Sequence, residues 1–179
     1  MNDPESYENH LSEDEPRWFA VYTKYKREKL VLKRLQQKGI EVYLPLQEFL
    51  RRHQRKTRVV ELPVISCYIF VHITRVSYVP VLETMDVVRF VRFSHNLIAI
   101  PDCEMQILKQ VINEGLPIEA VPYVYEIGDV VEITSGNLKG LRGILSKKNT
   151  KNNFLIDLNS IGYSLRMQVD PRFLNKVDQ

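Results

Sequence analysis

The stretch ISCYIFVHI, residues 65–73, gives the strongest indication of fold in this chain. Its alternate residues, from Ile65 to Ile73, form one wholly apolar face, while the residues between them are polar or aromatic. Because successive side chains of a strand point to opposite sides of a sheet, this alternation predicts a β-strand with one face in a core. The other face carries Tyr68 and Phe70, and its amphipathic character is typical of a surface that is covered only part of the time.

Further strands and helices are expected on both sides of this strand. In chain order they are the strand RWFAVYT (17–23), a helix capped by Thr23 and ending at Gly39, a hairpin over 46–63, a short helix from Ser77, the strand VVRFVRF (87–93) and a helix from Pro101 to Gly115. Helices packed against an antiparallel sheet describe an α+β fold.

A second, smaller domain is expected at the C-terminal end. Residues 115–124 contain two prolines and show no clear period, which is typical of a linker. Over residues 125–179, short β-branched runs alternate with glycines, which predicts a small β-barrel of about five strands. The expected division is therefore a leader (1–16), a first domain (17–114), the linker and the barrel.

Charge is distributed unevenly along the chain. The leader has six acidic residues and no Lys or Arg, and its composition predicts disorder. Residues 17–114 have 17 Lys/Arg against nine Asp/Glu, whereas residues 115–179 are almost neutral. A positive potential on the first domain favours a nucleic acid or another acidic partner.

The densest basic run is RRHQRKTR, residues 51–58, at the tip of the expected hairpin. One interpretation is a solvated tip, because charge runs usually mark exposed surface. The other, which we favour, is a non-specific contact with the nucleic-acid backbone, since the run has no aromatic residue on which a base could stack. The cations concerned are Arg51, Arg52, Arg55, Lys56 and Arg58.

No catalytic or metal-binding pattern is present in the sequence. The four histidines are scattered, and no paired carboxylates, nucleophile pattern or phosphate-binding loop occurs. Cys67 and Cys103 are too far apart for a C-x-x-C motif, and no apolar run approaches the length of a membrane span or resembles a signal peptide. We therefore expect a soluble, cytoplasmic protein that is not an enzyme, needs no cofactor and contacts no membrane.

Four stretches taken together resemble the NusG family of transcription elongation factors, in which an NGN domain precedes a KOW domain. They are WFAVYTKYKREKLVLKRL, LPVISCYIFVHI, VVRFVRFSHNLIAIPDCEM and EIGDVVEITSGNLKGLRGIL. The resemblance covers residues 17–177 and implies an NGN-type sheet with helices followed by a KOW-type barrel. The third stretch looks closer to the specialised paralogues RfaH and UpxY than to the general factor. Where the family usually has Pro-Gly-Tyr or Pro-Asn-Tyr, this chain has Ser66-Cys67-Tyr68, so a different local turn is expected.

The resemblance also implies a site for RNA polymerase. Positions that match the family's hydrophobic depression, which receives the tip of the polymerase clamp helices, are Tyr22, Tyr68, Phe70 and Phe93. From the pattern alone, these rings are equally compatible with a second small core. The implied function is that of a specialised elongation and antitermination factor. The alternatives are a housekeeping elongation factor and a ribosome-associated RNA-binding KOW protein.

Two further sites follow from the resemblance. A basic helix face made of Lys24, Lys26, Arg27 and Arg34 would read the displaced non-template DNA strand, with the hairpin tip near upstream DNA. In a glycine-rich loop of the barrel, Leu138 and Leu141 would contact ribosomal protein S10 or the termination factor Rho, although the end of the barrel core is the alternative. The glycines and β-branched strands of this domain make a helical form of it unfavourable, so we expect a stable barrel. The chain is expected to be a monomer.

Overall fold

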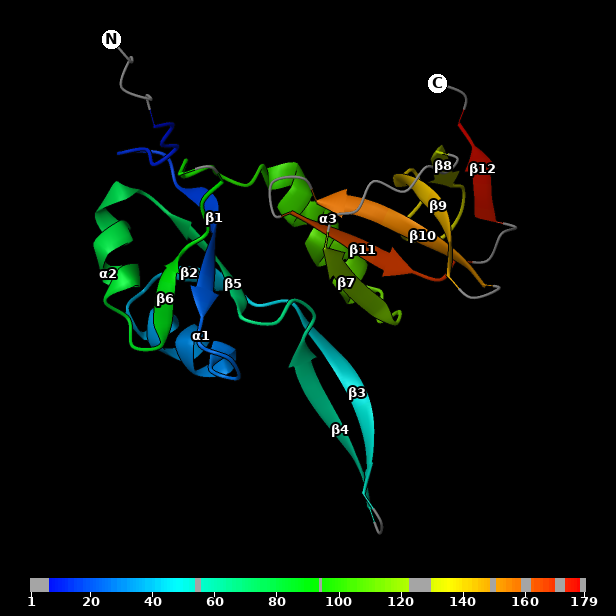
Figure 1. Cartoon of the computed structure of the whole chain (residues 1–179), viewed down its shortest axis with the longest axis horizontal. Helices are drawn as coiled ribbons and strands as arrows, with labels where there is room; N and C mark the ends of the chain where they lie inside the picture. Colours follow the sequence, from blue (N-terminus) through cyan, green and yellow to red (C-terminus); the bar gives the residue numbers. More distant parts are fainter. Residues whose placement is uncertain are drawn as a thin grey trace. The chain divides into compact units, whose positions relative to one another are not determined.

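The computed structural model describes residues 7–53, 56–93, 95–122, 130–148, 151–158, 162–169 and 173–177 (Figure 1). In chain order its elements are β1 (Arg17–Thr23), α1 (Glu28–Gln37), β2 (Glu41–Tyr43), β3 (Leu46–His53), β4 (Lys56–Pro63), β5 (Tyr68–Ile73), the 3-10 turn η1 (Arg75–Ser77), α2 (Tyr78–Leu82), β6 (Val87–Phe90), α3 (Asp102–Asn113), β7 (Ile118–Pro122), β8 (Val130–Ile133), β9 (Arg142–Lys148), β10 (Lys151–Leu158), β11 (Tyr163–Met167) and β12 (Leu174–Lys176). Antiparallel sheets combined with helices make this the predicted α+β fold.

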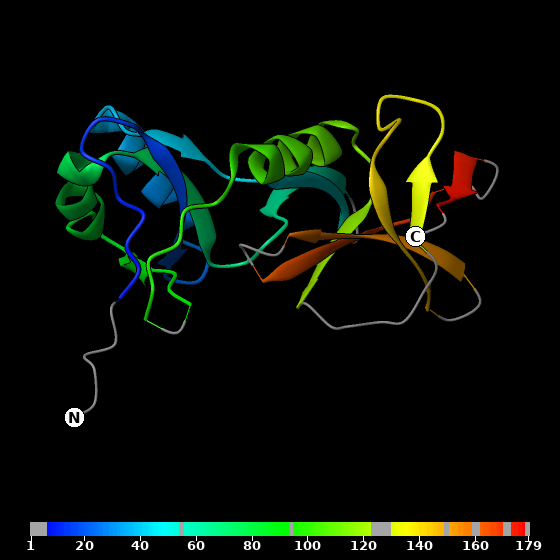
Figure 2. The ribbon, with the colours of Figure 1, turned by 90° about the horizontal axis from the view of Figure 1, so that it is seen from above.

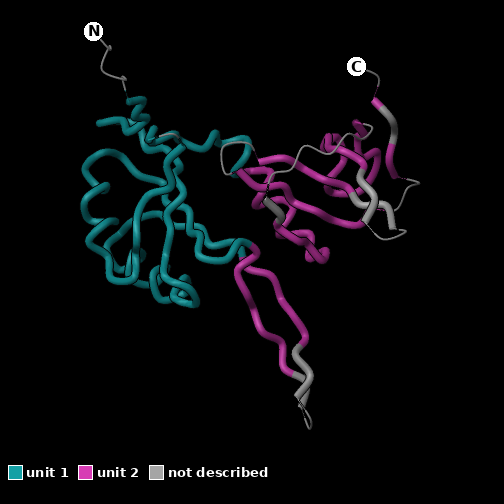
Figure 3. Tube along the Cα trace, in the orientation of Figure 1, with its two compact units in different colours: residues 1–45, 65–105 teal, residues 46–64, 106–179 magenta. Residues whose placement is uncertain are grey.

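The chain divides into two compact units, which Figure 3 shows in different colours. The first consists of residues 1–45 and 65–105, and the second of residues 46–64 and 106–179. This division differs from the expected one, because the β3–β4 hairpin and most of α3 group with the C-terminal sheet.

The first unit is built on a four-stranded antiparallel sheet in the order β2-β5-β1-β6. Strands β5 and β1 pair so that Ile69 lies opposite Val21 and Val71 lies opposite Phe19. All four side chains are fully buried, and α1 contacts both β2 and β5. The apolar face predicted for this strand is therefore confirmed as core.

Strand β5 begins three residues after Ile65, where the sequence pattern predicts its start, because the chain turns at Cys67. Its φ of 66° lies in the left-handed region, which glycine and asparagine adopt more readily than other residues, and β5 starts only at Tyr68. The Oε1 atom of Glu28 accepts a hydrogen bond from the backbone N–H of Cys67 at 2.9 Å. Although neither Gly nor Asn occupies this position, Cys67 adopts the conformation that suits those residues.

Helix α1 begins at Glu28 and not directly after Thr23, which is the last residue of β1. The N-cap is Arg27, and no side chain caps the helix, so the expected capping role of Thr23 is wrong. The helix ends at Gln37, just before Gly39, whose φ of 73° supplies the left-handed stop that the sequence predicts.

Helices α2 and α3 begin where the sequence predicts them. In α2, Pro80 lies in the first turn, where its missing N–H is tolerated. In α3, Met105, Leu108 and Val111 recur at helical spacing and are buried. The strand expected over VVRFVRF is shorter, because β6 ends at Phe90.

Part of the leader is ordered in the first unit. The backbone N–H of His10 donates to the carbonyl of Leu97 at 2.9 Å, and the N–H of Leu97 donates to the carbonyl of Glu8 at 2.9 Å. These bonds join residues 7–16 to the loop before α3, which the acidic composition does not indicate. Residues 1–6 lie outside the described part of the chain.

The second unit begins with the predicted hairpin. Strands β3 and β4 pair from Leu46 opposite Pro63 to His53 opposite Lys56. At the base of the hairpin, Gln47 donates a hydrogen bond from Nε2 to the carbonyl of Leu116 at 2.6 Å. Its Oε1 atom accepts one from the backbone N–H of Ile118 at 3.3 Å, so Gln47 ties the start of β7 to the hairpin.

The rest of this unit is a six-stranded antiparallel sheet, β12-β8-β9-β10-β11-β7, which forms the small barrel-like domain. Strand β10 lies between β9 and β11, as the labels in Figure 1 show, and Figure 2 gives the view of this sheet from above. Five of the strands lie within 125–179, but β7 comes from the stretch expected to be a linker. This segment forms a strand because Ile118 is buried, at only 8% exposure, and because its backbone pairs with the edge of β11.

Close packing inside this sheet depends on Gly143. A side chain at this position would meet the backbone carbonyl oxygen of Leu155 first and then the ring of Phe154, which is fully buried in the neighbouring strand β10. The glycine therefore lets β9 lie close to the backbone and the Phe154 ring of β10.

Candidate functional site

Two of the predicted polymerase-binding residues form a close pair on neighbouring strands. Tyr22 of β1 lies opposite Tyr68 of β5 in the register, and their ring centroids are 4.4 Å apart. The Tyr68 hydroxyl donates a hydrogen bond to the Tyr22 hydroxyl at 2.6 Å. The guanidinium of Arg89 lies over the Tyr22 ring, 5.0 Å from its centroid. Tyr22 is half-buried, so part of this ring remains accessible.

The remaining two aromatic residues differ in exposure. Phe70 lies on the same face of β5 as Tyr68, and these two side chains are 0% and 4% exposed, respectively. The expectation that this face is amphipathic and only partly covered is therefore wrong for these two rings, which are buried as core residues. Phe93, by contrast, is 36% exposed and lies in the loop after β6. We refer to these four residues as the aromatic set.

The predicted basic helix face is divided between a turn and a helix. Lys24, Lys26 and Arg27 precede α1, so their expected place on the helix is wrong, while Arg34 does lie on it. The backbone N–H of Arg27 donates to the carbonyl of Lys24 at 3.0 Å, and Lys26 has a φ of 61°. We refer to residues 24–27 as the basic turn. All four of its side chains are exposed.

A carboxylate that the sequence analysis did not single out connects the basic turn to Arg34. Asp86 accepts a 2.6 Å hydrogen bond from Arg34 Nη1, and its Oδ1 lies 3.8 Å from Lys24 Nζ. The hydrogen bond from Arg34, together with the charges of Arg34, Arg27 and Lys24, holds the pKa of Asp86 below its ordinary value despite partial burial. Asp86 thus stays ionised and fixes the two cations it contacts.

The predicted hairpin cations are only partly described by the structure. Arg51 lies opposite Arg58, and the side chain of Arg58 is exposed. The backbones of Arg52 and Lys56 belong to β3 and β4. Arg55, and the side chains of Arg51, Arg52 and Lys56, lie outside the described part of the chain.

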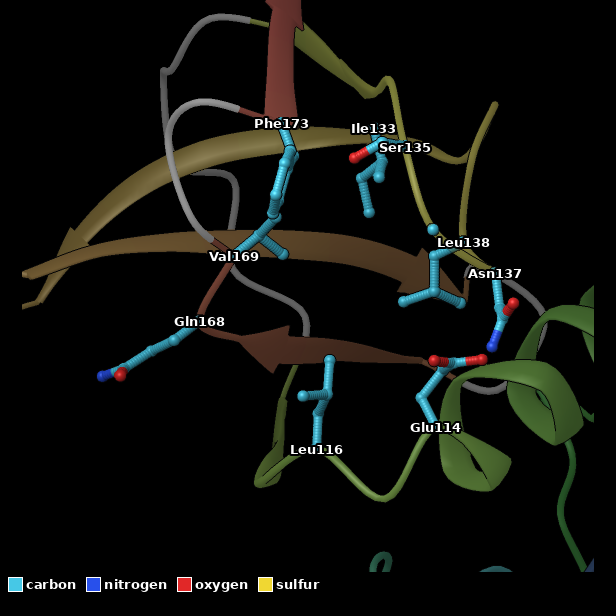
Figure 4. Close-up of a pocket in the computed structure, with 10 residues that line it drawn as sticks. Glu114, Leu116, Ile133, Ser135, Asn137, Leu138, Gln168, Val169 and Phe173 are labelled. Atoms are coloured by element: carbon cyan, nitrogen blue, oxygen red, sulfur yellow. The ribbon is translucent and has the colours of Figure 1, made fainter.

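Leu138 lies beside a cavity of about 460 Å³ in the second unit (Figure 4). Other apolar lining residues include Leu116, Val169 and Phe173. Leu138 itself is only 5% exposed, whereas Leu141 is half-buried. The first of these two predicted contact residues is therefore mainly a core residue at the end of the barrel.

Within the described ranges, no cluster of three or more His, Cys, Asp or Glu side chains is arranged to hold a metal ion. The two cysteines are free thiols, with Cys67 half-buried and Cys103 exposed. None of the helices found there is long and apolar enough to cross a membrane.

A comparison with known protein families shows to which family this chain belongs. The profile described as "Transcription termination factor nusG" matches residues 16–109, which is more than half of the chain. The chain belongs to the NusG family. The predicted family is thereby confirmed, and a NusG-family chain is a transcription factor. No match is found among curated proteins.

Comparison with solved structures supports the NusG fold. The structure described as "Domain interaction in Thermotoga maritima NusG" is 19% identical, covers 91% of this chain and 98% of its own, and has a TM-score of 0.52. Two conformations of the MjSpt4:Spt5 complex, A and B, are each 20% identical and cover 90% of this chain. They cover 99% and 97% of their own chains, with TM-scores of 0.30 and 0.32.

Three residues near the candidate surfaces escaped the sequence analysis. Asp86 and Arg89 are brought there by the fold, and nothing in their local sequence indicates it. Tyr25 did carry a signal, because it stands between Lys24 and Lys26. This is the aromatic interleaving that the hairpin run lacks.

Proposed function

We propose that this NusG-family chain is a specialised elongation and antitermination factor that binds RNA polymerase and suppresses pausing or termination in selected operons. Two observations support polymerase binding. The first unit carries the aromatic set, and the chain belongs to a family of transcription factors. Such a factor acts in the cytoplasm as a monomer, without a cofactor. It makes and breaks no bond, and changes transcription by binding one polymerase state more tightly than another.

The accessible rings of the aromatic set provide the contact with the polymerase clamp helices. Tyr22 is half-buried and Phe93 is 36% exposed, so both have surface to offer a partner. The hydroxyl of Tyr68 on the neighbouring strand donates a 2.6 Å hydrogen bond to the Tyr22 hydroxyl and so helps to orient this ring. A helix tip docked on such rings would gain most of its binding free energy from a few aromatic contacts.

Nucleic acid is the second proposed partner. The cations Lys24, Lys26, Arg27 and Arg34 would contact the non-template strand of the transcription bubble, and the hairpin run 51–58 would contact upstream DNA. Because Lys and Arg bind phosphates without specifying sequence, these contacts position the factor and make its binding salt-dependent.

The barrel-like domain would bind a third partner, ribosomal protein S10 or Rho. Leu141 is half-buried and lies beside the cavity loop that carries Leu138, so it is the more accessible of the two leucines. A partner held there is kept at high effective concentration near the polymerase.

The first test is co-purification of the tagged full chain with RNA polymerase from its host. A Tyr22→Ala/Phe93→Ala variant removes the accessible rings and spares the buried ones. A central aromatic contact contributes about 2 kcal/mol or more, so each truncation should weaken binding about 30-fold. Phe49→Ala is the matched control, because this ring is 42% exposed but lies on the hairpin.

Polymerase recovered with the wild type and the control, but not with the double variant, supports the proposal. Recovery of ribosomal RNA or ribosomal proteins in place of polymerase would instead support the ribosome-associated alternative.

A further inference from the structure

Tyr25 is the aromatic residue of the basic turn, and its ring contributes little to the core of the first unit. Its side chain is 65% exposed, and its neighbours Lys24, Lys26 and Arg27 are exposed as well. Lys26 Nζ lies 5.1 Å from the centroid of the Tyr25 ring. A single exposed ring is ordinary on a protein surface. A ring among three cations on one short turn has the composition of a nucleic-acid contact.

The basic turn is held in place by backbone hydrogen bonds at its N-terminal end and across the turn. The N–H of Thr23 donates to the carbonyl of Cys67 at 2.8 Å, and the N–H of Lys24 donates to the carbonyl of Asp86 at 2.9 Å. Within the turn, Lys26 has a φ of 61°, which a non-glycine residue keeps only where its surroundings hold it. The turn therefore presents Tyr25 on a pre-formed backbone, which loses little freedom on binding.

Asp86 organises the charges beside this ring. Arg34 Nη1 donates to Asp86 Oδ2 at 2.6 Å and to the carbonyl of Met85 at 2.9 Å. Lys24 Nζ lies 3.8 Å from the other carboxylate oxygen. The basic turn and Arg34 together contribute four cations against this one carboxylate, so the surface attracts an anionic partner.

We propose that the basic turn is a platform for an unpaired nucleotide, with Tyr25 stacked on the base and Lys24 and Lys26 beside the flanking phosphates. Stacking on tyrosine tolerates every base, because each has a π-face. A base inside a duplex has both faces covered by its neighbours, so the platform selects single strands. This inference rests on the proposed function and names the chemistry by which the displaced strand is held.

The test uses the full-length chain and a short fluorescein-labelled single-stranded DNA, with binding followed by fluorescence anisotropy. Loss of one stacked base costs about 5- to 150-fold in affinity, and we expect Tyr25→Ala to raise the Kd about tenfold. Tyr25→Phe keeps the ring and should bind like the wild type. Tyr7→Ala is the matched control, because Tyr7 is 66% exposed and lies in the leader.

Salt dependence separates the ring from the cations. Tyr25→Ala should leave the slope of log K against log salt unchanged, because a ring releases no counterions. Lys26→Gln should reduce the slope by about 0.7, the value for one phosphate of a single strand. The fluorescence of 2-aminopurine in the DNA should be quenched by the wild type but not by Tyr25→Ala.

An unchanged Kd for Tyr25→Ala, or an equal loss on a duplex of the same sequence, would overturn the platform. Absence of single-strand binding by the wild type would overturn it as well. Tighter binding of the corresponding RNA, lost equally with Tyr25→Ala, would support the platform and assign it to RNA. The outcome is independent of polymerase co-purification, so a failure here is distinguishable from a failure of the proposed function.

Discussion

Replacing Glu28 by alanine removes the side chain that connects helix α1 to the turn at Cys67. Glu28 is 4% exposed, and its Oε1 accepts the Cys67 N–H at 2.9 Å. A part-buried N–H that loses its partner costs about 1–3 kcal/mol. Loss of a negative charge from the first helical turn costs a further ~0.3–1 kcal/mol. We therefore expect Glu28→Ala to lower the free energy of unfolding of the first unit by about 2–3 kcal/mol.

Urea unfolding monitored by Trp18 fluorescence measures this loss. Trp18 is the only tryptophan in the chain, is 5% exposed and belongs to the first unit. With a urea dependence of about 1–3 kcal/mol per molar, the midpoint should fall by about 1 M. Glu28→Gln keeps an acceptor oxygen and should lose less than half as much. Glu83→Ala, an exposed control, should stay within about 0.5 kcal/mol of the wild type. Equal midpoints for Glu28→Ala and Glu83→Ala would refute the reasoning.

Three other predictions concern titration and packing. Burial raises the pKa of Tyr43 from 10.0 to about 12, so the folded chain keeps a proton that the unfolded chain releases, and stability should fall as pH rises from 10 to 12. Tyr43→Phe should flatten this decline in urea midpoints; an equally steep decline would argue against it. Burial, and then the charge of Glu28, raises the pKa of the Cys67 thiol. In a chain with Cys103 replaced by serine, Glu28→Gln should therefore speed the alkylation of Cys67 at a fixed pH. Equal rates would contradict this assignment. Gly143→Ala sets a methyl group against the backbone carbonyl of Leu155 and the ring of Phe154, and should cost about 1–3 kcal/mol in thermal unfolding, a loss that an unshifted transition would disprove.

Hydrophobic periodicity predicted the buried faces of single strands and helices well, because alternation and helical spacing are short-range patterns. The buried side of β5 and the buried stripe of α3 both follow directly from alternation and helical spacing. The same alternation could not show that Phe70 is fully buried, since a strand pattern does not reveal what covers its second face.

Contacts between distant segments were beyond the reach of the pattern. Asp86 joins Lys24 and Arg34 only because the loop before β6 returns to the end of β1. Likewise, the segment of β7 was expected to be part of a linker, because it contains Pro122 and has little hydrophobic periodicity. It forms a strand through its pairing with β11. Local sequence does not encode either partner.

The most direct test of the account is the lifetime of a transcriptional pause, measured with the host RNA polymerase on a pause-containing template. The wild-type chain should shorten the pause and increase read-through of a terminator. Tyr22→Ala/Phe93→Ala should lose this effect, while Phe49→Ala should keep it. Pause lifetimes that are unchanged by the wild type, or shortened equally by the double variant, would contradict polymerase binding through the aromatic set.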